Sequence, residues 1–246
     1  MLKRLTIALS FLLMIVMMPR AVWAMHIGDG FLPPQWCISW GALSIPFVVI
    51  GLYSIQKTVR QSPKLKMLIA MAGAFAFVLS ALKIPSVDGS SSHPTGVGLG
   101  AILFGPSVMS VLGLIVLLFQ AFLLTHGGLS TLGANVFSMA VVGPITAFAV
   151  YKTVKMAKGP QWLAVFLGAA LGNLLTYVTA SVQLALAFAG GTGEFFVSLS
   201  KFLSVFALTQ IPLAISEGIL TVLMFNTLSV HSRDELKELN VISREV

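Results

Sequence analysis

Two adjacent residues, Met25 and His26, have the chemistry of a metal chelator if the chain is cut just before them. The freed Met25 amine and the His26 amide nitrogen would close a five-membered ring on a metal. The same amide nitrogen and the imidazole Nδ1 would close a six-membered ring. Three nitrogens in nearly one plane suit Ni(II), Cu(II) or Co(II). We therefore predict a metal site at this dipeptide, created by proteolysis.

The segment before this dipeptide, residues 1–24, has the pattern of a secretory signal peptide. Its charged start, short apolar run and cleavage site are Lys3 and Arg4, Leu5–Met18, and Val22-Trp23-Ala24. We expect cleavage after Ala24. Two alternatives stay open: the segment remains attached as an anchor, or Met25 is the true start residue. Only the uncleaved anchor removes the predicted chelate.

A second candidate ligand, His93, lies in the polar loop 90–98 (SSSHPTGVG). Serine and glycine allow backbone to approach a ligand closely, and His93 could supply a fourth nitrogen to Met25 and His26. The alternative is that His93 only caps the following helix. That helix would point its positive end at the loop, which disfavours a cation there.

Four further polar residues need separate interpretation: Asp29, His126, His231 and Glu217. Asp29 could orient a ligand or offset the charge of the ion, or it could be a turn residue. We expect His126 to be a turn residue or a hydrogen-bond partner of the ligands, and His231 to be plain surface. Glu217 lies within the last predicted span, where an intramembrane acid is functional by default, although its partner is not evident.

Charged residues make up 9% of the chain and hydrophobic residues 57%, against roughly 25% charged in a soluble domain. This composition predicts a polytopic membrane protein of the all-α class. The single cysteine, Cys37, excludes an intrachain disulfide. Without Lys3, Arg4 and Arg20 the net charge is +4, which cytoplasmic loops explain better than nucleic acid binding. No nucleotide-binding loop is present, so ATP hydrolysis would need another subunit.

The apolar stretches predict about seven transmembrane helices between residues 25 and 228, followed by a cytoplasmic tail, 229–246. The expected spans are 36–56, 67–82, 131–151, 161–189, 198–228, and a pair within 97–124 that is broken at Gly105-Pro106 and has one short or half-inserted member. Each full span needs about 20 residues to cross a ~30 Å core. Basic loops after residues 56 and 151 place those ends inside, the mature amino terminus outside and the carboxyl terminus inside.

The second predicted span contains small residues at helical spacing, Ala70, Ala72, Ala74 and Ala76. Such spacing lets helices approach closely. From the residues alone, packing within the bundle is slightly favoured over contact with another subunit.

Four motifs together resemble the CbiM family, the substrate-capture subunits of energy-coupling-factor cobalt transporters, which are close to the nickel NikM proteins. They are MHIGDGFLP, SSHPTGVGLGAILFGP, HGGLSTLGANVFSMAVVGP and TQIPLAISEG, spread over most of residues 25–228. The resemblance implies a six-helix core with an extra amino-terminal helix, and metal held by Met25, His26 and His93. It also favours contact of Ala72 and Ala76 with a partner subunit. It further implies that Thr95 and Asn135 lie around the metal ligands without binding the metal themselves.

The resemblance further implies a transmembrane coupling subunit, a small accessory membrane subunit and an ATPase pair as partners. The expected function is capture of external Co(II) for cobalamin synthesis, with Ni(II) as the alternative substrate and no catalytic cofactor. Two other classes are weighed. A membrane metalloenzyme would need a general base at the metal, and we expect Glu217 to lie far from the external histidines. A passive channel would conduct ions without partners or ATP.

Overall fold

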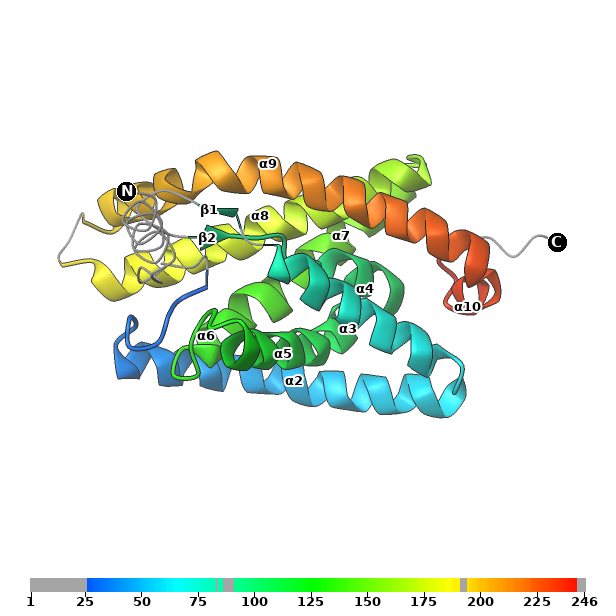
Figure 1. The fold of residues 1–246 in the computed structure, drawn as a ribbon, viewed down its shortest axis with the longest axis horizontal. Coiled ribbons are helices and arrows are strands. Elements are labelled where there is room, and N and C mark those ends of the chain that lie inside the picture. Colours follow the sequence, from blue (N-terminus) through cyan, green and yellow to red (C-terminus); the bar gives the residue numbers. More distant parts are fainter. Residues whose placement is uncertain (1–25, 83, 86–90, 191–193, 243–246) are drawn as a thin grey trace, which may run out of the picture.

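The computed structural model describes residues 26–82, 84–85, 91–190 and 194–242. Figure 1 shows two layers of long helices, with α2 and α5 on one side and α8 and α9 on the other. The helices are α2 (Pro34–Gln61), α3 (Leu65–Ala81), α4 (Val97–Phe104), α5 (Pro106–Leu123), α6 (Leu132–Asn135), the π-helix η2 (Val136–Val142), α7 (Gly143–Met156), α8 (Gln161–Phe188), α9 (Glu194–His231) and α10 (Arg233–Glu238). The predicted signal peptide and Met25 lie outside the described residues.

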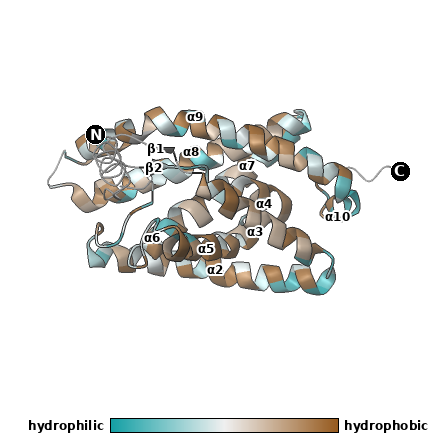
Figure 2. Ribbon diagram, in the orientation of Figure 1, coloured by the Kyte–Doolittle hydropathy of each residue, from teal (hydrophilic) through white to brown (hydrophobic). Residues whose placement is uncertain are grey.

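This architecture confirms the all-helical membrane bundle. Because α6, η2 and α7 form one continuous segment, the described chain contains the seven predicted helical segments, followed by α10. Five of them are long and apolar enough to cross a bilayer. The other two are α3, with 17 residues, and α4, with eight. In Figure 2 hydrophobic residues cover the helices, and hydrophilic residues concentrate towards their ends.

The predicted break within residues 97–124 is confirmed at Gly105. Its φ of 85° lies in the region that glycine tolerates, and Pro106 then begins α5, where its missing N–H costs nothing. The chain therefore enters the bundle as α4 and turns into α5. All seven positions of α4 before Phe104 are buried, so this short helix is surrounded by protein.

A two-residue antiparallel pairing precedes α4. Strand β1 (Ile84–Pro85) pairs with β2 (Ser91–Ser92), with Ile84 opposite Ser92. The sequence pattern did not indicate this pairing or the π-helix η2. The pairing matters because β2 leads directly into His93, so the chain is already held on one side of that residue.

The inner face of α3 packs against α4, which corrects the expectation that Ala72 and Ala76 contact a partner. Their exposed fractions are 1% and 0%. A Cβ at Gly96 would lie only 2.5 Å from the Ala76 Cα, so the two backbones almost touch. Ala70 and Ala74 occupy the exposed face of the same helix. The small residues of α3 therefore lie on two faces of the helix. Ala72 and Ala76 lie on the buried face, and only the face with Ala70 and Ala74 is open to another subunit.

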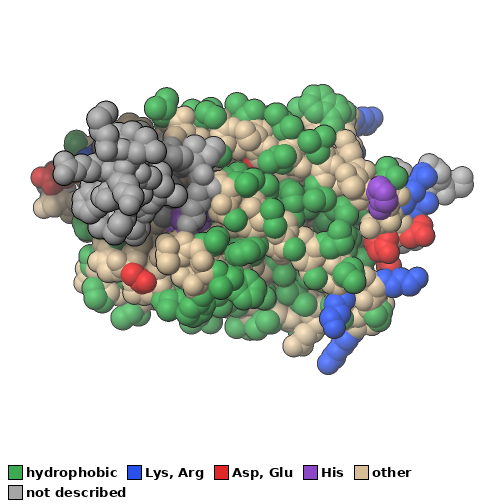
Figure 3. All heavy atoms as spheres, in the orientation of Figure 1, with side chains coloured by type: hydrophobic (Ala, Val, Ile, Leu, Met, Phe, Trp, Pro, Cys, Tyr) green, Lys and Arg blue, Asp and Glu red, His purple; other side chains and the backbone are tan. Residues whose placement is uncertain are grey.

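The tail after α9 turns back onto the bundle as α10. Leu236 is fully buried and packs with Phe225, Leu228 and Val241. Figure 3 shows Lys and Arg side chains gathered around this end of the bundle, where α2 also ends. The opposite end, where α2 begins, carries the polar site described next.

Candidate metal site

The amino-terminal segment is clamped into the bundle by one asparagine. The Ile27 N–H donates to Asn135 Oδ1 at 3.0 Å, and Asn135 Nδ2 donates to the Ile27 carbonyl at 3.1 Å. The Thr131 hydroxyl donates to the same carbonyl. Both backbone groups of Ile27 are thereby satisfied in a buried place, where an unpaired group is costly. The side chain of Ile27 packs with Leu32 and fixes the segment further.

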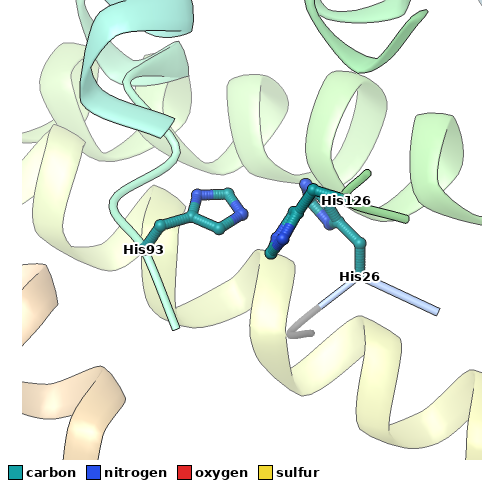
Figure 4. A group of neighbouring side chains, drawn as sticks. All are labelled: His26, His93 and His126. Atoms are coloured by element: carbon teal, nitrogen blue, oxygen red, sulfur yellow. The ribbon is translucent and has the colours of Figure 1, made fainter. Parts of the chain in front are cut away.

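This clamp holds His26 in a cluster of three imidazoles. The ring centroids of His26 and His93 are 4.8 Å apart, those of His26 and His126 5.2 Å, and those of His93 and His126 4.6 Å. One nitrogen from each ring lies within 4.8 Å of the other two. Figure 4 shows the three rings converging on one place from three separate chain segments. All three side chains are at most 2% exposed.

The His93 ring has a defined orientation. Its Nδ1 lies 2.7 Å from the Pro94 carbonyl oxygen. A carbonyl can only accept, so Nδ1 donates and the lone pair of the neutral ring sits on Nε2. A hydrogen bond at one ring nitrogen that leaves the other as donor atom is the usual arrangement of histidine ligands.

The loop that carries His126 is tied both to α5 and to the amino-terminal segment. The His126 N–H donates to the Gln120 carbonyl at 3.1 Å, and Asp29 Oδ1 accepts from the backbone N–H and hydroxyl of Ser130 at 2.8 and 2.7 Å. These two bonds to Ser130 lower the pKa of the Asp29 carboxyl. Asp29 therefore links the segments that carry His26 and His126.

The structure brings together more of the predicted residues than the sequence indicated. His26, His93 and Asn135 lie close together, and His126 adds a third ring to the cluster. Met25 lies outside the described residues. His231 is exposed at the end of α9, with Nδ1 near the Thr227 carbonyl.

The expectation that Glu217 lies far from the external histidines is wrong. Its carboxylate accepts hydrogen bonds from Thr95 and from the Gly96 N–H, two and three residues after His93. Thr95 accordingly contacts Glu217 rather than a ligand ring. Sequence reasoning also missed Thr131 and Ile27. A tertiary clamp on backbone groups leaves no periodic signal, so only the folded chain reveals it.

These features define a multi-pass helical membrane protein with a buried cluster of nitrogen donors. The chain belongs to the CbiM family: the family model described as "Cobalt uptake substrate-specific transmembrane region" matches residues 26–235. It is 60% identical over 222 residues to the cobalt transport protein CbiM of Chlorobium limicola, covering 90% of this chain and 87% of that protein. It is 62% identical over 218 residues to the CbiM protein of Desulforamulus reducens, covering 89% and 86%.

Two solved structures share the fold. One, described as the crystal structure of a transition metal transporter, has a TM-score of 0.74 at 25% identity, covering 85% of this chain and 94% of the other. A truncated transition metal transporter has a TM-score of 0.73 at 27% identity, covering 84% and 99%. The family is therefore one of cobalt transport components, and the helical bundle is that of known metal transporters.

The Asn135 clamp leads to a first prediction. Replacing Asn135 with Leu removes both hydrogen bonds to Ile27, so the amino-terminal segment should detach and Co(II) affinity should fall about 10- to 100-fold, as for other residues that orient ligands. Asn135→Asp keeps the acceptor for the Ile27 N–H and should lose less. Isothermal titration calorimetry on the purified protein measures both. Equal affinity in Asn135→Leu and wild type would show that the clamp does not position His26.

Proposed function

We propose that this chain captures Co(II) from outside the cell, as the substrate-binding membrane subunit of an ATP-driven energy-coupling-factor importer that supplies cobalamin synthesis. One observation carries the proposal: His26, His93 and His126 converge within 4.8 Å in a buried place next to the amino terminus. Imidazole suits borderline divalent metals. The relatives are named cobalt transport proteins, which favours Co(II) over Ni(II).

The proposed ligand set combines the cluster with the mature amino terminus. The Met25 amine, the His26 amide nitrogen and the imidazoles of His26 and His93 supply four nitrogens, and His126 supplies another beside them. Binding displaces water from the ion and protons from the Met25 amine and the His26 amide, so affinity should rise with pH. A planar four-nitrogen set also suits Ni(II), which is the alternative substrate.

The proposed orientation places the histidine cluster at the external side of the membrane and α10 at the cytoplasmic side. Basic side chains gather at the α10 end of the bundle, and Lys and Arg favour the cytoplasmic side. Cleavage of residues 1–24 outside would leave the new amine on the same side as the cluster. The ion would then enter from outside and leave inward when the subunit reorients in the bilayer.

Import against a gradient requires partners in this proposal. They are a transmembrane coupling subunit, a small accessory membrane subunit and an ATPase pair. The faces of this chain that these partners leave uncovered would contact membrane lipid. The exposed face of α3 with Ala70 and Ala74 is the open small-residue surface of that helix. Close helix approach needs such residues, so this face replaces Ala72 and Ala76 as the proposed partner contact.

A non-enzymatic role fits the site better than a metalloenzyme. A hydrolytic metal centre needs a general base beside the bound water. Glu217 bonds Thr95 and Gly96, two and three residues after His93, and four hydrogen-bond donors already occupy its two oxygens. It is therefore not available to accept a proton from water at the metal.

Uptake of radioactive Co(II) into vesicles tests the function. The chain alone should bind the ion without moving it, whereas vesicles with all partner subunits should accumulate Co(II) only when ATP is present inside with the ATPases. Excess Ni(II) as competitor ranks the two substrates. ATP-independent flux through the chain alone would establish a passive channel and refute the coupled importer.

A further inference from the structure

Glu217 is the most deeply buried acid among the described residues, and the proposed metal ligands do not include it. It lies within the membrane-spanning part of α9 and is 0% exposed. An acid at this depth is costly unless its charge is compensated. The residues that surround Glu217 therefore have to explain why it is there.

Four donors converge on the carboxylate. Oε2 accepts from the Thr95 N–H and from Asn173 Nδ2, both at 2.6 Å, and Oε1 accepts from the Thr95 hydroxyl and the Gly96 N–H, both at 2.9 Å. Gln210 Nε2 donates to Asn173 Oδ1 at 3.2 Å, which orients the Asn173 amide with its NH₂ towards Glu217. An ionised carboxylate can only accept hydrogen bonds, so it suits a place surrounded by donors. The groups around Glu217 point hydrogen atoms inward, so this place does not suit a cation.

Three of the four donors, on Thr95 and Gly96, lie at the start of α4, and the fourth, Asn173, lies in α8. Gly96 is the residue before the first helical position, Val97, and no side chain of its own segment caps this end. The first N–H groups of a helix lack partners within it and carry partial positive charge. Glu217, from a helix more than a hundred residues later, accepts from one of these groups, the Gly96 N–H, and brings its carboxylate to the helix end. It thereby offsets the positive helix end that would otherwise disfavour a cation nearby.

The same contacts fix the loop that carries His93. Pro94 restricts the backbone between His93 and Thr95, and Gly96 is wedged against Ala76 on its other side. On the upstream side, the Ser92 hydroxyl lies 2.9 Å from the Thr209 hydroxyl of α9. The residues on both sides of His93 are therefore bonded to α9. Ser92 bonds Thr209 on one side, and Thr95 and Gly96 make the larger number of bonds, to Glu217, on the other.

We propose that Glu217 is a positioning residue of the metal site: its carboxylate binds Thr95 and Gly96 at the start of α4 and holds His93 at bonding distance from the ion that His26 and His126 meet. The inference rests on the proposed metal-capture function. It makes α9 part of the binding site, although α9 supplies no ligand atom.

The decisive variant is Glu217→Gln, which keeps the size of the side chain but removes its charge and turns one acceptor atom into an NH₂ donor facing other donors. The dissociation constant for Co(II), measured by calorimetry on the purified full chain, should rise about 10- to 100-fold. In a His93→Ala background the same substitution should change the constant little, because its effect passes through His93. The visible absorption of bound Co(II) in Glu217→Gln should shift towards that of His93→Ala.

Thr221→Val is the matched control. Thr221 lies one turn further along α9 and is equally buried, and its hydroxyl makes no hydrogen bond within the described part of the chain. The control should bind Co(II) as the wild type does. Thr95→Val, which deletes only the hydroxyl donor to Glu217, should weaken binding less than Glu217→Gln, and Thr95→Ser should restore it. This pair decides the matter if Glu217→Gln does not fold.

The outcomes separate the two proposals. A wild type that fails to bind Co(II) overturns the proposed function and this inference with it. If the wild type binds, unchanged affinity in Glu217→Gln, or an equal loss with and without His93, overturns the positioning role alone. A loss confined to chains that contain His93 establishes it.

Discussion

A chain in which His26 is replaced by Ala is expected to lose high-affinity Co(II) binding. The substitution removes the imidazole and breaks the six-membered chelate ring. Structural zinc sites gain about 10–16 kcal/mol from roughly four ligands, which is about 2.5–4 kcal/mol per ligand and a factor of about 100 to 1,000 in affinity. The remaining amine and amide nitrogens would no longer be preorganised, so the loss should reach the upper end.

Titration calorimetry with Co(II) measures this change, and His231→Ala is the matched control. His231 is an exposed histidine at the far end of α9, so its loss should leave the dissociation constant unchanged. His26 packs in the interior, and thermal unfolding of both variants without metal shows whether the bundle is intact. Stoichiometric binding of Co(II) by His26→Ala at wild-type affinity would reject the site.

Retention of residues 1–24 is expected to reduce Co(II) affinity by a similar factor of about 100 to 1,000, because one nitrogen ligand is lost. In the uncleaved chain the Met25 nitrogen is an amide, without the lone pair that a primary amine offers. The metal site would then exist only after processing.

Ala24→Phe tests this, because signal peptidases require a small residue before the cut. The uncleaved product should be compared with a chain expressed from Met25, and amino-terminal sequencing of each sample identifies its first residue. The Met25 chain should bind as the native protein does. Native membrane protein that begins Met-Leu-Lys and still binds Co(II) tightly would contradict the chelate.

Local patterns were sufficient for the seven helical segments. Uncharged stretches between basic loops predicted the helices, because a bilayer core excludes charge whatever the rest of the fold does. Gly105-Pro106 predicted the break between α4 and α5, because the conformations of glycine and proline are properties of single residues. His26 and His93 were likewise singled out by residue type and setting.

Residue type alone misjudged positions whose roles depend on a distant neighbour. The alternation in α3 marks Ala70 to Ala76 as small, but which of them are buried depends on where Gly96 and α4 pack. The sequence around His126 indicated a turn residue or a hydrogen-bond partner of the ligands. In the structure the loop after α5 lies beside the amino-terminal segment and brings the His126 ring next to those of His26 and His93. Glu217 looked isolated because its partners, Thr95 and Asn173, are 122 and 44 residues away.

The sequence by itself therefore determined the membrane class, the helical segments and two of the three histidines of the cluster, since these follow from hydropathy and local chemistry. Only the tertiary structure decided that three imidazoles meet, that Asn135 holds the amino-terminal segment, and that an acid in α9 supports His93. Each of these needs atoms from distant segments within a few ångströms of one another, and that proximity arises only when the helices pack.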